Sequence, residues 1–513
     1  MRFAPAWTRR ERAASLLSSP IVIRDRAVVA VVSLMVLLPS FLFAPVLRAF
    51  PAALLMAGCC GAFWLVLGPK PVSDDDVLRR PLRVRQLSAC IGLAFVIFLL
   101  GGETHLFYAT EDWSIRDAVL ADLVSHGNPV LYDWNGATYL LRAPLGMYMV
   151  PAFVGRGLGL FAAHVALLGQ NATLLGATLY LLMSLGRGWA HLAILIAFGG
   201  LSIVGALLLS TAGQDHYWPH LQRWGMDTWH PFYQYSSSIV QFFWVPNHAL
   251  PGWWLATLLL LNTRSTVDVA TIGVSVAALA FWSPLAVLPF IPWLVFVVAT
   301  QWREVLFARR TWVGFIIAAA FLPIVAYLLL APATIAHDSP LSQNNFLLWY
   351  VIFILFQLPV LRLVGAQWSD VPREWRALFV INGAILLALP FFKFGPNNDL
   401  VMRGSITSLV IVAFVFGALA PREKGKLVVA ALAYVLIAIG SVPAMYEVYR
   451  AIVKPRYAIS RCSLQEASLA IDKQGLPSNY IAPATAMPNW LIDLRGIEAV
   501  GFVDRPCWPD RKQ

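Results

Sequence analysis

The stretch LSACIGLAFVIFLLGG at residues 87–102 carries no charged side chain, and it is soon followed by YATEDWSIRDAVLADLV at 108–124, which carries five. The apolar run approaches the ~18 residues needed to cross the ~30 Å hydrocarbon core of a bilayer. Similar runs recur along the chain, and an α-helix is the structure that satisfies its own backbone hydrogen bonds in lipid. The sequence therefore predicts a polytopic α-helical membrane protein, and it raises the question of why acids stand beside an apolar segment.

The composition agrees with a membrane protein. Of the 513 residues, 59% are hydrophobic and only 13% are charged, and the mean hydropathy is +0.68. The net charge of +11 could indicate a nucleic-acid partner. However, Lys and Arg concentrate in cytoplasmic loops of membrane proteins, and the basic residues lie in short connecting segments, so we expect membrane lipids as partners and no nucleic acid. These basic segments are 70–86, 301–312, 365–376 and 421–426.

The apolar runs predict an all-α fold with about 13 transmembrane helices. We expect a cytoplasmic N-terminus at 1–26, a transmembrane domain at 27–447 and an extracytoplasmic C-terminal tail at 448–513. The predicted spans are 27–47, 50–69, 87–102, 160–186, 190–211, 240–261, 267–282, 284–300, 313–332, 345–364, 376–393, 404–420 and 426–447.

Alternation of the spans places the polar loops opposite the basic ones. The alternation is consistent only if 144–158, which contains Pro144 and Pro151, does not cross the membrane, so an interfacial or re-entrant helix is predicted there. Interfacial helices are also expected earlier in this first large loop. The predicted outer loops are 103–158, 212–239, 333–344 and 394–403.

The acids at 108–124 have a structural and a functional interpretation. Thr110 could cap a helix whose first turn holds Glu111 and Asp112, where acids complement the macrodipole. Capping does not explain Asp122, which lies three turns further on and, eleven residues after Glu111, on nearly the same face. Acids beside a low-dielectric slab tend to have a raised pKa, which suits a general base. We predict a catalytic or ligand-binding role within this set.

Two outer-loop segments add candidate substrate-binding residues. The segment GQDHYWPHLQRWGMDTWHPFY at 213–233 holds Asp215 and His216. His216 and His220 have a spacing that suits zinc on a helix, but Pro219 lies between them and no HExxH pattern is present, so no metal site is predicted. In VPNHALPGWW at 245–254, His248 could bind substrate or could be a hydrogen-bonded interfacial histidine.

A third segment, FKFGPNNDLVMRGS at 392–405, places Lys393 and Arg403 on either side of Asn398 and Asp399. Arg403 could simply extend toward the interface. With an Asn-Asn-Asp turn beside it, we favour an anion site, because a guanidinium suits bidentate contact with phosphate.

Two of the five cysteines, Cys462 and Cys507, lie in the predicted extracytoplasmic tail. An oxidising compartment permits a disulfide between them, and two free thiols are the alternative. We predict the disulfide.

The layout of residues 87–450 resembles the GT-C class of integral-membrane glycosyltransferases, in which a transmembrane helix leads into a large outer loop bearing an essential acid. Here that loop carries Glu111 and Asp112, and the segment Arg142-Ala143-Pro144-Leu145 is similar to a short HPPL segment of that class, without its His and one Pro. The segments DWSIRDAVLADLV, VPNHALPGWW and GPNNDLVMRGS also resemble a subgroup of large bacterial membrane proteins.

The resemblance implies a polyprenyl-phosphate-sugar donor, an envelope glycan or glycolipid acceptor, and a bacterial inner membrane with the active face on the periplasmic side. It implies that Asp112, or Asp122, takes the acceptor proton. Arg403, helped by Lys393 and by Arg142 or Arg223, would stabilise the leaving phosphate. It also admits a divalent cation, Mg²⁺ or Mn²⁺, held by Glu111 or Asp112. A flippase for a lipid-linked saccharide and a noncatalytic envelope-assembly protein are the alternatives.

Overall fold

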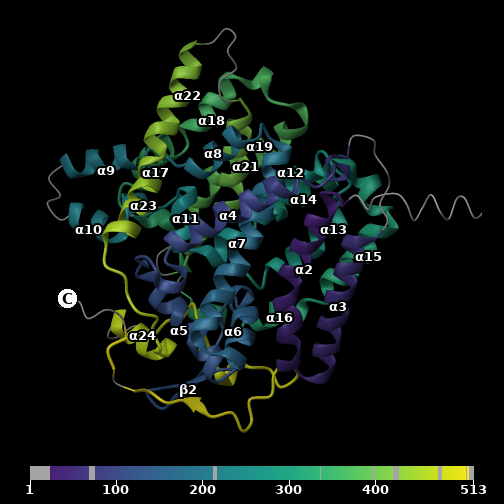
Figure 1. Ribbon diagram of the computed structural model, residues 1–513, viewed down its shortest axis with the longest axis vertical. Helices are drawn as coiled ribbons and strands as arrows, with labels where there is room; N and C mark the ends of the chain where they lie inside the picture. The colour runs from purple at the N-terminus through teal and green to yellow at the C-terminus, as the bar shows by residue number, and fades with distance from the viewer. Residues whose placement is uncertain are drawn as a thin grey trace, which may run out of the picture.

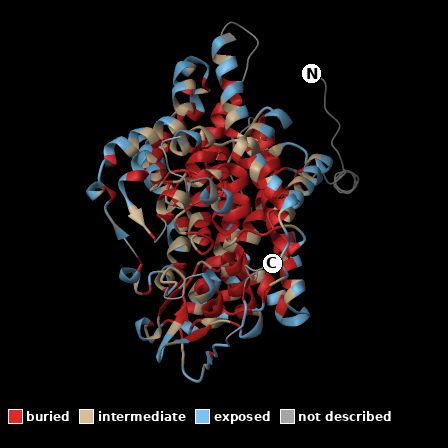
Figure 2. Ribbon diagram, turned by 90° about the vertical axis from the view of Figure 1, so that its left-hand side faces the viewer, coloured by how far each residue is buried: buried red, intermediate tan, exposed pale blue. Residues whose placement is uncertain are grey.

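The structure is a computed structural model that describes residues 23–68, 76–211, 217–230, 232–335, 337–395, 398–419, 427–471, 476–503 and 505–507. It is mostly helical, and buried residues run through the centre of the helix bundle (Figures 1 and 2).

Within the described residues, seven helical segments are long and apolar enough to cross a membrane. They are Arg26–Val46, Ala49–Leu67, Leu160–Leu185, Trp189–Ser210, Arg373–Phe391, Asp399–Leu419 and Val428–Val453. Two bent pairs raise the count to nine if each pair is one span: α14 (Phe290–Leu306) with α15 (Arg309–Ala319), bent by 114°, and α17 (Phe346–Gln357) with α18 (Pro359–Ala366), bent by 57°. The structure thus supports a multi-pass membrane protein, while the count of thirteen spans stays a prediction.

The α-helices of the described residues lie partly within these long segments and partly outside them. The long segments above contain α2 (Arg26–Phe43), α3 (Ala49–Leu67), α7 (Leu160–Leu185), α8 (Trp189–Ala197), α9 (Ser202–Thr211), α19 (Arg373–Ala388), α20 (Asp399–Gly404), α21 (Ile406–Leu419), α22 (Leu427–Gly440) and α23 (Val442–Val453). The other α-helices are α4 (Val84–Leu100), α5 (Asp112–Ser125), α6 (Gly146–Leu158), α10 (Tyr217–Trp224), α11 (Ser238–Trp244), α12 (Pro246–Asn262), α13 (Val269–Leu279), α16 (Leu322–Leu328) and α24 (Leu464–Ile471).

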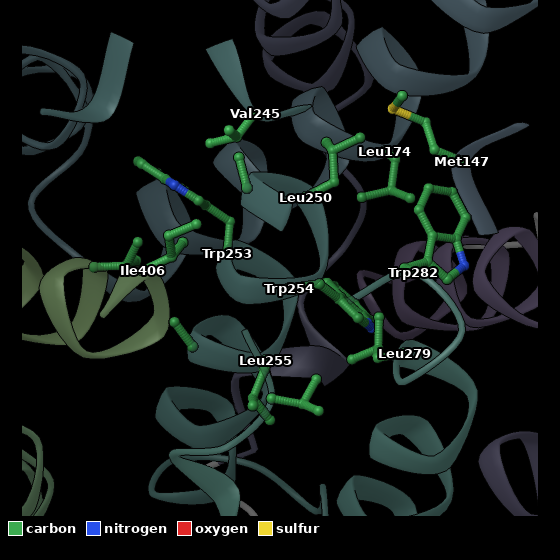
Figure 3. Close-up of a cluster of buried hydrophobic side chains, with 14 of the residues drawn as sticks. Met147, Leu174, Val245, Leu250, Trp253, Trp254, Leu255, Leu279, Trp282 and Ile406 are labelled. Atoms are coloured by element: carbon green, nitrogen blue, oxygen red, sulfur yellow. The ribbon is translucent and has the colours of Figure 1, made fainter. Parts of the chain in front are cut away.

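Helix α12 forms the centre of the bundle. It contacts α7, α13 and α21, and nearly every residue along it is buried, as expected of a helix that is apolar on all sides. Figure 3 shows its Trp253 and Trp254 among aliphatic side chains, with Trp282 nearby. The indole nitrogens of Trp253 and Trp282 donate hydrogen bonds to Gln241 Oε1 (3.0 Å) and to the Val36 carbonyl (3.1 Å), so these large residues are buried without losing their polar contacts.

Contacts between the connecting segments fall into two groups. One group joins residues 264–268 to three of the predicted cytoplasmic loops: Arg264 pairs with Glu374, Thr266 donates to Asp76 Oδ2 at 2.9 Å, and Arg310 pairs with Asp268. The other joins predicted outer loops: Arg223 pairs with Glu111 at 2.9 Å, and β3 (His337–Asp338) pairs with β4 (Lys393–Phe394). The side of a membrane on which each group lies stays a prediction.

The expectation of an all-α fold is wrong in the first large loop. There β1 (Leu131–Trp134) and β2 (Ala137–Leu141) form a hairpin, joined by Asn135 and Gly136 with φ of 53° and 80°. Positive φ at both central residues is the signature of a type I′ turn, for which Asn-Gly is the strongest sequence signal. The prediction of an all-α fold used helix length and hydrophobicity, and it did not take this Asn-Gly turn into account.

The C-terminal segment packs onto this hairpin, as the yellow chain in Figure 1 shows. Strand β5 (Ile481–Pro483) pairs antiparallel with β2, and β6 (Ala499–Val500) pairs parallel with β1, which gives a four-stranded sheet in the order β5-β2-β1-β6. Cys462 and Cys507 are joined as a disulfide with Cα atoms 5.5 Å apart. Helix α24 packs on α5, which is therefore enclosed by protein instead of presenting a free apolar face.

The segment 144–158 forms the 13-residue helix α6, which packs on α5 and α7. It is too short to pass the length test for a membrane span. Length alone does not separate it from α4 and α12, predicted spans whose helices are 17 residues long, so its interfacial position stays a prediction.

Candidate functional site

The N-terminal turns of α5 present a carboxylate and a guanidinium group on one face, those of Asp112 and Arg116. Arg116 Nη2 donates to Asp112 Oδ2 at 3.2 Å, as the four-residue spacing on a helix allows. The Asp112 side chain is 38% exposed, whereas that of Arg116 is 2% exposed. The carboxylate is thus open to a reactant while the guanidinium stays inside the protein.

Helix α20 supplies a second such pair. Arg403 Nη2 lies 3.0 Å from Asp399 Oδ1, and both side chains are mostly buried. The turn before α20 is tight: Gly395 has φ of 87°, and a Cβ on it would lie 2.3 Å from Asp399 Oδ2. Asn398 follows with φ of 54°, so a glycine and an asparagine provide the left-handed conformations that start this short helix.

Two tyrosines lie within electrostatic range of both arginines of these pairs. The phenol of Tyr480, in the turn before β5, lies within electrostatic range of Arg116, Arg403, Asp112 and Asp399. The phenol of the buried Tyr148, on α6, likewise lies within range of Arg116 and Arg403. Burial raises the pKa of Tyr480, so this phenol keeps its proton at neutral pH and can donate a hydrogen bond. We call these six residues the Asp112–Arg403 cluster.

The cluster contains buried donors without acceptors. Among the described residues, no hydrogen-bond partner is found for Nε and Nη1 of Arg116, Nε of Arg403 or the hydroxyl of Tyr148. A buried donor that lacks an acceptor costs about 1–3 kcal/mol, and more if it is charged. Unpaired donors on two guanidinium groups suit an anion with multiple oxygens, such as a phosphate.

His248 lies near this cluster but is engaged by neighbours. It is 4% exposed, and its ring nitrogens lie 2.7 Å from Ser283 Oγ and 3.1 Å from Asn247 Nδ2. The charges of Arg403 and Arg116 both act on it. The hydrogen-bonded interpretation of His248 therefore fits its contacts, and its ring lies within electrostatic range of both arginines of the cluster.

Other sequence candidates make contacts of their own. Arg223 Nε and Nη2 each donate to a Glu111 oxygen at 2.9 Å, which ties α10 to α5. Arg142 Nη2 donates to the carbonyl of Ser478 at 2.7 Å, which holds the C-terminal segment. Lys393 lies in β4, and its backbone pairs with Asp338. Asn398 Nδ2 donates to the Phe232 carbonyl at 3.4 Å.

The expected divalent cation at Glu111 or Asp112 has no ready ligand set. Each of these acids is paired with an arginine. In the described part of the chain, no group of three close metal-ligating side chains includes either acid. Asp215 and His216 lie outside the described residues.

Asp122, the alternative base, joins three elements of the fold. Its Oδ2 accepts hydrogen bonds from the Tyr132 hydroxyl (2.7 Å) and from the Leu464 backbone N–H (2.9 Å), so it connects α5 to β1 and α24. It is 3% exposed, and burial raises its pKa to about 7. These contacts favour a role in holding the C-terminal segment on α5.

The Asp122→Asn variant is expected to gain stability relative to the wild type as the pH rises from about 4 to about 7. The folded chain retains the Asp122 proton up to about pH 7, whereas the unfolded chain releases it near the ordinary pKa of an aspartate, so the wild type loses stability through this window. Asn does not titrate, and its amide oxygen can accept both hydrogen bonds. Thermal unfolding in detergent across this pH range measures the difference. Parallel curves for the two proteins would contradict the assignment, and Glu498→Gln, an exposed carboxylate, is the control.

Sequence reasoning missed three members of the cluster. Arg116 had a visible signal, because it follows Asp112 by one helical turn within the acidic stretch. Tyr148 and Tyr480 had none, since only the folding of α6 and of the C-terminal segment against α5 brings them to it.

No protein-family model matches this chain, and no curated protein or solved structure shows significant similarity to it. The chemistry of the site is therefore inferred from its own residues.

Proposed function

We propose that this protein is a membrane glycosyltransferase that moves a sugar from a polyprenyl-phosphate donor to an envelope glycan or glycolipid. The observation that carries the proposal is the Asp112–Arg403 cluster: the partly exposed Asp112 carboxylate pairs with Arg116, and both Arg116 and Arg403 have buried N–H donors without a partner among the described residues. A base next to a phosphate-binding pair is what transfer from a phosphorylated donor requires.

In the proposed reaction, Asp112 accepts the proton of a hydroxyl group on the acceptor. The oxygen of that hydroxyl forms a bond to the anomeric carbon of the donor sugar. The bond from that carbon to the phosphate oxygen breaks, and polyprenyl phosphate leaves with both electrons. Arg403 and Arg116 stabilise the charge on the leaving phosphate, and the Tyr148 and Tyr480 hydroxyls can donate to it. A single displacement assisted by one base inverts the configuration at the anomeric carbon.

The apolar surface of the bundle suits the isoprenoid part of the donor. Large apolar side chains such as Phe153, Leu158 and Phe161 are exposed on α6 and the start of α7, close in sequence to Tyr148. In this proposal the protein spans a bacterial inner membrane up to thirteen times, with the Asp112–Arg403 cluster at the periplasmic surface. The prenyl chain would lie along the helices and the phosphate in the cluster.

Mass spectrometry of lipids extracted from the purified protein tests the donor class. A co-purifying polyprenyl-phosphate sugar, and its inverted transfer by reconstituted protein, are the expected results. A saccharide lipid that the reconstituted protein moves between leaflets without breaking the sugar–phosphate bond would instead identify a transporter.

Arg403→Lys is expected to lower the turnover of sugar transfer by about 10²-fold, the usual effect of losing one donor that stabilises developing charge. Lysine keeps a cation beside Asp399, so the buried acid is not left unpaired, but it lacks the guanidinium fork that a phosphate needs. Single-turnover assays with saturating donor measure the change. Arg495→Lys, at a side chain that is 83% exposed, should retain activity. Equal turnover in Arg403→Lys and Arg495→Lys would exclude Arg403 from phosphate binding.

A further inference from the structure

Two histidines and an aspartate from separate elements meet inside the protein, and none of the three belongs to the Asp112–Arg403 cluster. His105 lies in a short turn after α4, Asp117 on α5 and His164 on α7. One ligand atom from each lies within 4.8 Å of the other two. His105 Nε2 is 2.7 Å from Asp117 Oδ2, and the two imidazole rings are 5.8 Å apart between centroids. The three residues are 5%, 1% and 0% exposed, so water does not reach them freely.

His164 gives an independent reason to expect a ligand. It is fully buried, and neither of its ring nitrogens has a hydrogen-bond partner among the described residues. Buried polar groups are nearly always paired, and leaving one unpaired costs about 1–3 kcal/mol. Asp117 and His105 lie within its electrostatic range. A cation between the three side chains would give a ring nitrogen of His164 the partner that it lacks.

The backbone before His105 forms a tight turn that brings this residue close to α5 and α7. Gly102, Thr104 and His105 have φ of 92°, 70° and 58°, and a Cβ on Gly102 would lie 2.5 Å from Ala109 Cα. The turn therefore folds tightly back after α4. Glu103, in the same turn, accepts a 2.7 Å hydrogen bond from Asn171, which fastens the turn to α7. His105 is thus positioned between α7 and α5.

We propose that His105, Asp117 and His164 bind one divalent transition-metal ion, for which Zn²⁺ is the best chemical match. Two imidazoles and one carboxylate form a common zinc ligand set, with bonds of about 2.0–2.2 Å. Their ligand atoms already lie within 4.8 Å of one another, close enough for all three to face one ion. The ion joins α5 to α7 and to the turn after α4, and so holds the helix that carries Asp112 and Arg116. The site stands on its own residues and does not depend on the proposed sugar transfer.

The test measures metal bound to the full-length protein in detergent. Protein that is stripped with a chelator, reloaded with ZnCl₂ and dialysed is expected to hold about one zinc ion per chain. His164→Ala is expected to bind zinc at least about 10²-fold more weakly, because losing a ligand exceeds the ~10–100-fold effect of losing an outer-shell partner. His126→Ala, at an exposed histidine just after α5, is the matched control and should bind normally. Wild-type protein that retains no zinc, or equal zinc in wild type and His164→Ala, would overturn the proposal.

A second measurement keeps the proposal testable if His164→Ala fails to fold. X-ray absorption at the zinc edge of the reloaded wild type should show a first shell of nitrogen and oxygen that includes two imidazoles. A shell containing sulfur would assign the metal to the free thiols of Cys59, Cys60 or Cys90 and would overturn the proposed site. Zinc should also raise the unfolding temperature of the wild type and leave that of Asp117→Asn unchanged, because binding to the folded state alone stabilises it.

Discussion

Replacing Asp112 with Asn is expected to lower sugar transfer by about 10³-fold, in the middle of the range for removing a general base. Asn has the shape of Asp, and its amide oxygen can still accept the hydrogen bond from Arg116 Nη2. The variant should therefore fold and bind the donor lipid normally. What it loses is the ability to take the acceptor proton, so the effect should appear in turnover and not in donor affinity.

Reconstituted protein with a prenyl-phosphate sugar provides the measurement, with donor binding followed in parallel. Glu498→Gln makes the same chemical change at an exposed carboxylate of the C-terminal segment and should leave transfer unchanged. Full transfer by Asp112→Asn would remove Asp112 as the base. Loss of donor binding together with turnover would instead indicate that Asp112 acts by positioning Arg116.

The membrane character of the chain could be predicted because it depends on run length and composition alone, which need no knowledge of tertiary contacts. The side on which each loop lies stays a prediction, which depends on the basic residues that mark one set of connectors. The hairpin at Asn135–Gly136 was missed although its turn signal is local. The pairing of β5 and β6 with that hairpin is a contact between distant segments, and nothing in either segment specifies its partner.

In the candidate site, too, contacts within one helix could be predicted from spacing, whereas contacts between distant segments could not. Arg403 and Asp399 are four residues apart on one helix, so their pairing follows from spacing. Asp117 lies within the acidic stretch, but its partner His105 belongs to a turn whose three positive φ values are not evident from the sequence. The contact of Asp122 with Leu464 likewise depends on how the C-terminal segment packs, so nothing in the sequence indicated that Asp122 connects α5 to α24.

A second large effect is expected at a buried ion pair on α23. Glu447 and Arg450 are each 1% exposed, and Arg450 Nη1 donates to Glu447 Oε1 at 2.7 Å. Arg450 Nη2 also donates to the carbonyl of Arg223 at 2.8 Å, which holds α10 against α23. Arg450→Met should lower the free energy of unfolding by about 3–5 kcal/mol, because it leaves the Glu447 carboxylate buried without a countercharge.

The double variant Arg450→Met with Glu447→Leu distinguishes the cost of an unpaired buried charge from the cost of the other contacts that Arg450 makes. With neither charge present, no uncompensated carboxylate remains, so the double variant should be more stable than Arg450→Met alone even though it has lost two polar side chains. Chemical unfolding in detergent measures all three proteins, with Arg495→Met, at an exposed pair with Asp493, expected to cost about 0–1 kcal/mol. If the double variant were as unstable as Arg450→Met, the cost would lie in the lost contact with the Arg223 carbonyl and in packing, and the charge of Glu447 would not be responsible.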